Sequence, residues 1–309
     1  MSELKEVSEA LRQAHAKFAD AVKQLRPDLH RYCSRMTGSV LDGEDLVQET
    51  LAQAAHQLSL RNEAVELRPW LFTIAHRRCV DFLRARSARA AAVLEDLSEA
   101  GGKELDVAIA DRQLAGLAFS HLVRALPPKE RAAVILREVL GHSLAETAAI
   151  LETSEGGVKS ALHRGREKLS AFDPGAKPAL SPPSPETARY LEAFNQRDWA
   201  RLTTLMADEV ECELVDFIVH RGRETIAGNY LATYGRLPFR WRMVWTAIEG
   251  EPAIVCLAEG ESGWRPRHAL RLSWKDGRVV HIRDYAHVDY LFDGARLGDG
   301  DLLELKVVT

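Results

Sequence analysis

The fold of the N-terminal half is decided by residues 127–170, which read PPKERAAVILREVLGHSLAETAAILETSEGGVKSALHRGREKLS. The leading proline pair stops a preceding helix, and the apolar-rich segment Lys129–Leu140 predicts a new helix that ends at Gly141. Ser143 and Glu146 have the spacing of a capping box, in which the hydroxyl and the carboxylate each satisfy a backbone N–H at a helix start. The stretch therefore predicts two consecutive short helices.

A third helix is predicted over Gly157–Leu169, after the tight polar turn of residues 152–157. Its apolar residues, which include Val158 and Leu162, fall on one face. The opposite face carries polar and cationic side chains: Lys159, Ser160, His163, Arg164, Arg166 and Lys168. A short helix, a tight turn and a second helix with a cationic outer face are typical of a helix-turn-helix module that binds DNA. An ordinary helical hairpin with a solvated face is the alternative.

Residues 126–169 resemble region 4 of extracytoplasmic-function sigma factors, a compact group of bacterial transcription initiation factors. The resemblance rests on Gly157, Val158, Lys159, Ser160, Leu162, Arg164 and Arg166, whereas Gly156 and His163 depart from the family's pattern. It implies that this module reads the minus-35 promoter element and contacts the polymerase β flap. The residues implied for minus-35 recognition are Ser154, Glu155, Gly156, Lys159, Ser160, His163, Arg164, Arg166 and Lys168.

An acidic helix is predicted around residues 42–50, DGEDLVQET. Leu46, Val47 and Thr50 point to one side, and Asp45, Gln48 and Glu49 form a stripe on the other because they are spaced i, i+3, i+4. The segment resembles the signature of sigma region 2, which implies docking on the clamp helices of the polymerase β′ subunit. The residues implied for that contact are Asp42, Glu44, Asp45, Gln48 and Glu49.

The next helix is predicted over residues 68–86, RPWLFTIAHRRCVDFLRAR, with Pro69 in its first turn. This stretch resembles the part of region 2 that binds and opens the minus-ten element, and residues 60–66 occupy the position of the family's base-capturing loop. Trp70 is a candidate for stacking on a base, and a core anchor is the alternative. The residues implied for minus-ten DNA are Arg61, Asn62, Trp70, Thr73, His76, Arg77, Arg84 and Arg86.

Two changes in composition divide the chain. Residues 173–185 hold five prolines and predict a semi-rigid linker. An acidic stretch before residue 112 predicts a tether between the two helical domains, either a nucleic-acid mimic near the template-strand channel or a solvated linker. The predicted domains are region 2 (1–92), the acidic linker (93–112), region 4 (113–172), the proline-rich linker (173–185) and a C-terminal domain (186–309).

The C-terminal domain is predicted to be α+β, with helices first and an antiparallel sheet after them. Helices are expected over residues 186–196, 199–206 and 223–234, and strands over 211–219, 241–248, 253–259, 268–274 and 278–285. Residues 190–210 and 274–289 resemble the SnoaL-like branch of the NTF2-like superfamily. That resemblance implies a cone-shaped fold with an apolar pocket, found also in cyclases and isomerases that use an Asp/His pair. The predicted fold class is thus two all-α sigma domains followed by this α+β cone.

Asp216, His281 and Asp284 are the candidate pocket residues of this domain. His281 and Asp284 have opposite parity on one regular strand, so they face opposite sides of the sheet unless a bulge intervenes. This argues against acid–base catalysis and predicts a chain that is not an enzyme. The resemblance implies regulation of the sigma regions in cis, whose sign is open because the WLPEP and DGGG signatures of known fusions are missing.

Composition excludes several classes of protein. The chain has 309 residues, 46% of them hydrophobic and 28% charged, with a formal net charge of −4, which fits two or three packed domains and no polycation. No apolar run is long enough to span a membrane, and the charged N-terminal segment does not resemble a secretory signal. The four scattered cysteines predict a cytoplasmic protein without a disulfide framework, structural zinc or other cofactor.

The sequence as a whole predicts an alternative sigma factor. Its expected partners are core RNA polymerase, promoter DNA and its own C-terminal domain, and the oligomeric state is left open. Two other classes remain alternatives: a ligand-sensing helix-turn-helix regulator that acts without polymerase, and a SnoaL-type isomerase or cyclase with a DNA-binding appendage.

Overall fold

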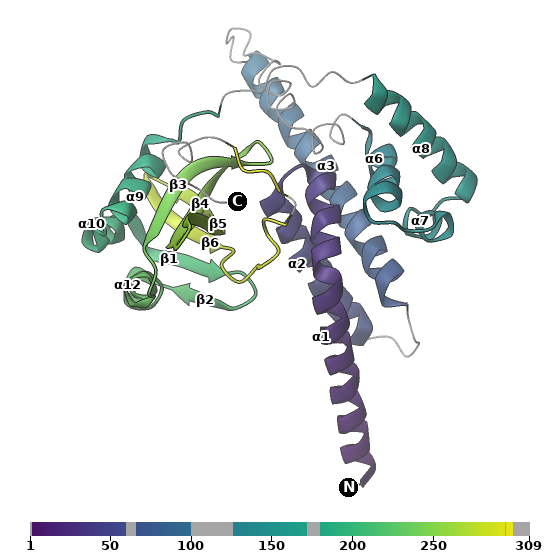
Figure 1. Cartoon of the computed structure of the whole chain (residues 1–309), viewed down its shortest axis with the longest axis horizontal. Coiled ribbons are helices and arrows are strands. Elements are labelled where there is room, and N and C mark those ends of the chain that lie inside the picture. The colour runs from purple at the N-terminus through teal and green to yellow at the C-terminus, as the bar shows by residue number, and fades with distance from the viewer. Residues whose placement is uncertain (1, 60–65, 100–125, 172–179, 294, 299–309) are drawn as a thin grey trace. The chain divides into compact units, whose positions relative to one another are not determined.

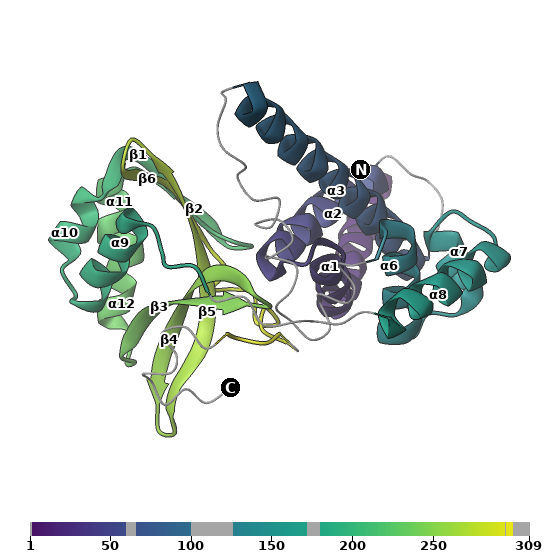
Figure 2. The same cartoon turned by 90° about the horizontal axis from the view of Figure 1, so that it is seen from above.

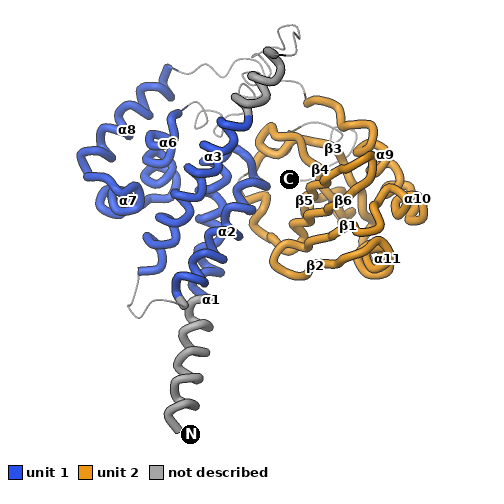
Figure 3. Tube along the Cα trace, turned by 180° about the vertical axis from the view of Figure 1, so that it is seen from behind, with its two compact units in different colours: residues 1–177 blue, residues 178–309 orange. Residues whose placement is uncertain are grey.

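The computed structural model of the chain describes residues 2–59, 66–99, 126–171, 180–293 and 295–298. Two compact units are present, residues 1–177 and residues 178–309, and each is described by itself (Figure 3). The base-capturing loop, with Arg61 and Asn62, and residues 100–112 of the predicted tether lie outside the described residues.

The first unit begins with three helices: α1 (Ser2–Thr37), α2 (Val40–Ser59) and α3 (Leu67–Glu99) (Figure 1). The α1–α2 turn is closed by Gly38, whose φ is +77°. At Gly43 the two helices approach so closely that a Cβ would lie 2.2 Å from Ser34 Oγ, so only glycine fits there. Because α3 is helical as far as Glu99, the first residues of the predicted tether continue this helix.

The helix-turn-helix follows in the same unit. Its elements are α6 (Pro128–Val134), which continues as the π-helical turn η1 (Ile135–Val139), then α7 (Leu144–Ile150) and α8 (Glu155–Ser170). Gly141 has a φ of +71° where the first helix ends, as predicted. The capping box is confirmed, because Ser143 Oγ accepts from Glu146 N at 3.1 Å and the Glu146 carboxylate accepts from Ser143 N at 2.6 Å.

One buried apolar cluster holds the described part of this unit together. It includes Leu29 and Tyr32 from α1, Phe72 from α3, and Ile135 and Val158 from the helix-turn-helix, all essentially inaccessible to solvent. The apolar periodicity of the sequence therefore marks the residues that form the core.

The second unit contains a six-stranded sheet in the order β2-β1-β6-β5-β4-β3. Its strands are β1 (Met206–Leu214), β2 (Ile218–Arg221), β3 (Trp241–Ile248), β4 (Glu251–Gly260), β5 (Gly263–Lys275) and β6 (Arg278–Asp284). β1 and β6 pair in parallel and the other neighbours are antiparallel. Register shifts interrupt the β1–β6, β4–β5 and β5–β6 pairs, and such irregularities bend a sheet.

Helices cover one face of the curved sheet (Figure 2). They are α9 (Pro185–Asn195), α10 (Trp199–Thr204) and the continuous run α11 (Arg223–Ile226), η2 (Ala227–Leu231) and α12 (Ala232–Arg236). The α+β architecture is confirmed. The single strand predicted over residues 211–219 is wrong: it is two strands, because Asp216 adopts a φ of +66° and Phe217 N–H donates to Leu214 O at 2.9 Å, which closes a turn.

A search of the described residues for a helix long and apolar enough to cross a membrane finds none.

Candidate nucleic-acid and polymerase interface

The outer face of α8 presents the residues predicted to read the minus-35 element. Ser154 caps this helix, because its Oγ accepts a hydrogen bond from Gly157 N at 3.1 Å. The helix therefore begins at Glu155, two residues before the predicted start. The predicted residues are all exposed: Ser154, Glu155, Gly156, Lys159, Ser160, His163, Arg164, Arg166 and Lys168. Since Val158, Ala161 and Leu162 are buried on the opposite side, the polar face is available to a ligand.

Glu130 of α6 organises the cations at the end of that face. Its carboxylate is almost fully buried and accepts from Arg164 Nε and Lys168 Nζ, each at 2.8 Å. These two hydrogen bonds hold the pKa of Glu130 below its usual range. Arg166 pairs in the same way with Glu138 at 2.6 Å. Lys159 and His163, nearer the helix start, make no ion pair with a described residue. Lys159 and His163 are thus not tied into ion pairs with described residues, whereas the later cations are braced by carboxylates.

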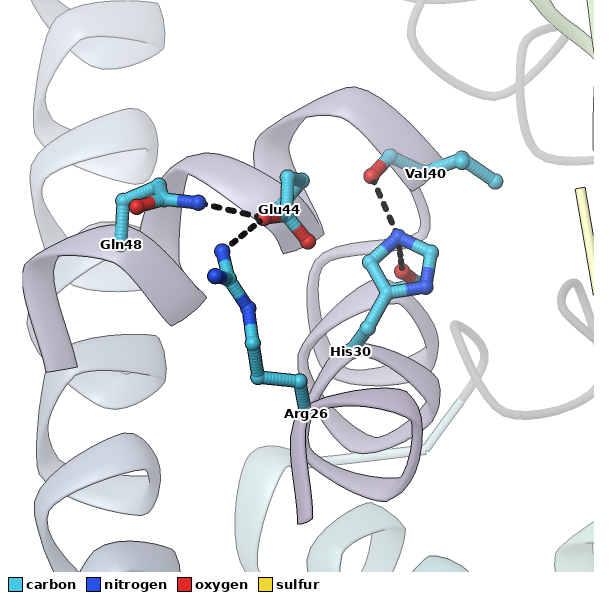
Figure 4. Close-up of polar contacts among 6 residues, drawn as sticks. Arg26, His30, Val40, Glu44 and Gln48 are labelled. Carbon is cyan, nitrogen blue, oxygen red and sulfur yellow. Dashed lines mark hydrogen bonds and ion pairs between the residues drawn. The ribbon is translucent and has the colours of Figure 1, made fainter. Parts of the chain in front are cut away.

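The acidic residues of α2 divide into an outer set and one buried member. Glu49 is exposed and Asp42, Asp45 and Gln48 are half-buried. Glu44, predicted as part of the docking surface, is fully buried instead. Its Oε1 accepts from Arg26 at 3.1 Å and from Gln48 at 2.6 Å (Figure 4). Glu44 lies on the core side of the helix, where it fixes Arg26 and Gln48, so its prediction as a docking residue is corrected.

His30 lies beside this cluster and fastens α1 to the start of α2. Its Nε2 is 3.1 Å from Val40 O (Figure 4). The same nitrogen is 3.1 Å from Ser34 Oγ. Burial, the largest influence, lowers the pKa of His30 to about 4, so the ring is neutral near pH 7.

The α3 residues predicted for minus-ten DNA are only partly available. Trp70 is half-buried and packs against the core, which favours the core-anchor alternative. His76 Nδ1 lies 2.8 Å from Tyr32 OH, and burial lowers the pKa of His76 to about 4. Arg77 and Arg84 are exposed, whereas Thr73 and Arg86 are half-buried. Arg77 and Arg84 therefore remain the clearest candidates for contact with a DNA backbone.

The helix-turn-helix touches this same helix within the first unit. Arg77 forms an ion pair with Glu152 of the α7–α8 turn, and the rings of Phe72 and His142 meet edge to face at 4.8 Å. This ion pair uses one Nη atom of Arg77, whose side chain is largely exposed and carries further N–H donors.

The three pocket residues predicted for the second unit are not brought together. Asp216 is exposed in the turn between β1 and β2. His281 and Asp284 lie on opposite faces of β6, as their parity predicts: His281 is 3.7 Å from Glu213, and Asp284 is fully buried. Among the described residues, no group of three or more His, Cys, Asp or Glu side chains is arranged to hold a metal ion.

Three residues that sequence reasoning missed surround Asp284: Tyr230, Tyr234 and His268. The two tyrosines are spaced i, i+4, which places them on one helix face. Asp284 pairs with Leu270 in the sheet, and His268 lies two residues from Leu270 on the same face. The i, i+4 spacing of the two tyrosines can be seen in the sequence, but the sheet register that brings His268 close to Asp284 cannot.

Comparison with known proteins places both helical domains. Residues 21–89 match the family model of sigma-70 region 2, and residues 116–169 match that of sigma-70 region 4. Two such regions in this order define a sigma-70-type transcription initiation factor. Over 297 residues the chain is 32% identical to the ECF RNA polymerase sigma factor SigG of Mycobacterium tuberculosis, a match that covers 86% of this chain and 80% of the relative. The chain therefore belongs to the extracytoplasmic-function (ECF) RNA polymerase sigma factor family.

Two solved structures are similar to different shares of the chain. The ECF sigma factor SigJ of Mycobacterium tuberculosis covers 89% of this chain and 98% of its own at 20% identity, with a TM-score of 0.34. A proposed ketosteroid isomerase from Kribbella flavida covers 32% of this chain and 73% of its own at 21% identity, with a TM-score of 0.27.

Proposed function

We propose that this alternative sigma factor initiates transcription with residues 1–172 and is regulated in cis by residues 186–309. In this proposal residues 1–92 are region 2, residues 113–172 are region 4, and residues 93–112 and 173–185 connect the domains. The observation that carries it is the exposed outer face of α8, capped at Ser154 and braced through Glu130. Such a helix presents its N-terminal side chains to base edges and its cations to phosphates.

Docking on core RNA polymerase is assigned to the outer residues of α2. Asp42, Asp45, Gln48 and Glu49 supply an acidic patch for the β′ clamp helices, and Gln48 is held in place by the buried Glu44. Region 4 contacts the β flap. The function requires no bond chemistry from this chain, and the protein acts in the cytoplasm.

Promoter recognition is divided between the two helical domains. Region 2 contacts the minus-ten element through Thr73, His76, Arg77, Arg84 and Arg86 of α3 and through Arg61 and Asn62 of the preceding loop. Trp70 anchors α3 in the core, and α8 reads the minus-35 element. Arg77 is paired with Glu152 of the helix-turn-helix, and its guanidinium has further N–H donors for a phosphate.

The proposal is tested by run-off transcription with core polymerase from the promoter upstream of the protein's own gene. The full chain is compared with a truncation that ends near Asp173. Transcription by either form supports sigma activity; more product from the truncation means that the C-terminal domain restrains the sigma regions, and less means that the active form needs it. No transcript together with no core binding contradicts the proposal, and tight duplex binding without polymerase favours an ordinary regulator instead.

A charge-reversal pair isolates the docking step. We expect the double variant Asp45→Arg, Glu49→Arg to bind core RNA polymerase at least 100-fold more weakly, because two carboxylates at the proposed contact become cations. Asp20→Arg is the matched control, since Asp20 is also an exposed carboxylate of the three-helix bundle. Equal affinity of the double variant and the control would refute the docking assignment.

A further inference from the structure

Two chain segments meet at one end of the C-terminal sheet. They are residues 236–242, which join α12 to the start of β3, and residues 259–267 of the β4–β5 hairpin. The sheet register brings them together, because Trp241 pairs with Ala258 on β4 and Ala258 pairs with Arg265 on β5. Of the described strands, β4 alone pairs with this end of β3. The two segments therefore form one surface, which we call the arginine rim.

The arginine rim is cationic. Its two segments contain two glutamates and no aspartate or lysine, and its five arginines are Arg236, Arg240, Arg242, Arg265 and Arg267. All five are exposed except Arg242, which is half-buried. Arg240 Nη1 lies 2.9 Å from Glu259 Oε2, yet the Arg240 side chain remains 77% exposed and its guanidinium has further N–H donors. The surplus of cations is local, because the whole chain has a net charge of −4.

Two aromatic side chains lie among these arginines. Phe239 is 44% exposed, and its ring meets that of Trp241 edge to face, with the centroids 5.8 Å apart. Trp264 is half-buried on β5, where it pairs with Glu259, the ion-pair partner of Arg240. Neither Phe239 nor Trp264 belongs to the buried apolar cluster of this unit. Aromatic rings that stay partly accessible between cations are typical of surfaces on which bases stack.

We propose that the arginine rim binds a single strand of nucleic acid. The guanidinium groups contact the phosphates, and Phe239 and Trp264 stack on bases. Charge complementarity selects a polyanion as the partner. Arginine suits phosphate better than lysine does, because its planar fork of N–H donors pairs with two phosphate oxygens at once. The proposal concerns the C-terminal unit alone and does not depend on the sigma activity of the helical unit.

The accessible rings favour a single strand over other anionic partners. In a duplex the bases already stack on one another, so Phe239 and Trp264 gain no stacking contact from it. An anionic membrane surface would attract the same arginines, but most of them lie on a loop and two strands rather than on the amphipathic helix typical of such binding. Arginines on an edge strand such as β3 also prevent pairing with another chain, a role that requires no ligand. These uses predict different crosslinking and vesicle-binding results.

Photo-crosslinking of the full chain to a single-stranded DNA of mixed sequence that contains 5-bromouracil locates the contact, with peptide mass spectrometry as the readout. We expect crosslinks at Phe239 or Trp264 besides those in the helical unit. The same sequence as a duplex should need at least a tenfold higher concentration to half-saturate crosslinking at these two residues. Crosslinks confined to residues 1–172, or equal crosslinking by the duplex, would overturn the proposal. Binding to phosphatidylglycerol vesicles without crosslinks at the rim would overturn it too, in favour of a membrane surface.

A triple variant removes exposed cations of the rim: Arg240→Ser, Arg265→Ser and Arg267→Ser. It should raise the concentration of single strand that half-saturates crosslinking at Trp264 at least tenfold, because phosphate contacts are lost. The matched control removes three exposed arginines elsewhere in the same unit: Arg189→Ser, Arg221→Ser and Arg278→Ser. The helical unit is the same in both variants, so a difference between them reports the C-terminal unit. If the two triple variants crosslink alike, the rim does not bind nucleic acid.

A second pair of variants tests the stacking. Phe239→Leu keeps an apolar side chain but removes the ring, and should raise the half-saturating concentration at Trp264 at least threefold. Phe217→Leu alters another exposed phenylalanine of the same unit and should leave it unchanged. Since both side chains are exposed, the melting temperatures of the two variants should match that of the unaltered chain. Equal crosslinking by both variants would contradict a stacking role for Phe239.

Discussion

Each unit of this sigma factor buries a carboxylate, and the two are treated differently. Glu44 in the helical unit accepts from the guanidinium of Arg26 and from Gln48. Asp284 in the C-terminal unit accepts from one tyrosine at 2.7 Å and keeps one oxygen unpaired. The first carboxylate is neutralised by its own chain and braces a helix that carries a proposed contact surface. The second has no lysine or arginine partner among the described residues: it accepts from Tyr230, and His268, whose pKa is lowered by burial, lies 3.5 Å from its other oxygen.

The largest effect should come from removing the cation beside Glu44. We expect Arg26→Met to lower the free energy of unfolding by roughly 2 to 4 kcal/mol, because it leaves a fully buried carboxylate without its charge partner. Urea denaturation of the full chain measures it. The matched control is Arg31→Met, which breaks the half-exposed Arg31–Asp28 pair and should cost less than about 1 kcal/mol. If both variants lose the same free energy of unfolding, the buried Glu44 carboxylate does not need Arg26 to be tolerated in the core.

The next largest change in stability is expected from protonation of the buried His30, which lies beside Glu44. The pKa of His30 is lowered from 6.5 to about 4 in the folded chain. Below pH 6.5 the unfolded chain binds a proton that the folded chain refuses until about pH 4, so stability falls as the pH is lowered through this window and is unaffected above it. Over the whole window, the free energy of unfolding falls by roughly 3 kcal/mol. Urea denaturation at pH 7 and pH 4.5 should show a smaller difference for His30→Gln than for His163→Gln, which alters an exposed histidine. If the change in stability between the two pH values is the same for both variants, His30 is not the residue that destabilises the fold at low pH.

The braced cations of α8 should have a smaller effect, seen in DNA binding. Arg164 is half-exposed and shared between Glu130 and a proposed phosphate contact. We expect Arg164→Ala to lower minus-35 affinity several-fold and to reduce the slope of log affinity against log salt by about one, because one phosphate contact is lost. Binding by the holoenzyme over a salt series measures both. Arg189→Ala, an exposed arginine of the C-terminal unit, is the control. An unchanged slope would count against the phosphate role.

The smallest change in the free energy of unfolding is expected for a substitution at Asp284. It tests whether this carboxylate differs from Glu44 in its contribution to stability. Since no lysine or arginine among the described residues pairs with this carboxylate, Asp284→Asn removes a buried charge and should change the free energy of unfolding by less than about 1 kcal/mol. The measurement is again urea denaturation of the full chain. A loss of 3 kcal/mol or more, comparable to the loss in Arg26→Met, would mean that the two carboxylates are structural in the same sense.

Short-range patterns explain why much of the fold could be predicted. The capping box at Ser143 and Glu146 depends on residues three apart, and the buried side of α8 on a 3.6-residue period. The opposite parity of His281 and Asp284 also depends only on nearby residues, and in the structure the two side chains lie on opposite faces of β6. The turn at Asp216 was missed because a strand pattern does not show a single residue with positive φ.

Contacts between distant residues could not be predicted, because nothing local encodes them. The resemblance to region 2 places Glu44 on the docking surface, but close packing of the two helices at Gly43 lets Glu44 pair with Arg26, 18 positions earlier. Glu130 meets Arg164 across 34 positions, and Tyr234 meets His268 across the same number. Each of these contacts depends on helix packing or sheet register.

Residue types and spacings within one turn or strand are enough to predict the order of the domains, the family, the polar face of α8 and the acidic helix α2. Which acidic residue is buried, which cations are braced, and how His268 and two tyrosines meet Asp284 follow only from the packing of distant segments. Burial and pairing are properties of several elements at once, so a carboxylate becomes a brace or part of a buried hydrogen-bond network according to what the rest of the chain places beside it.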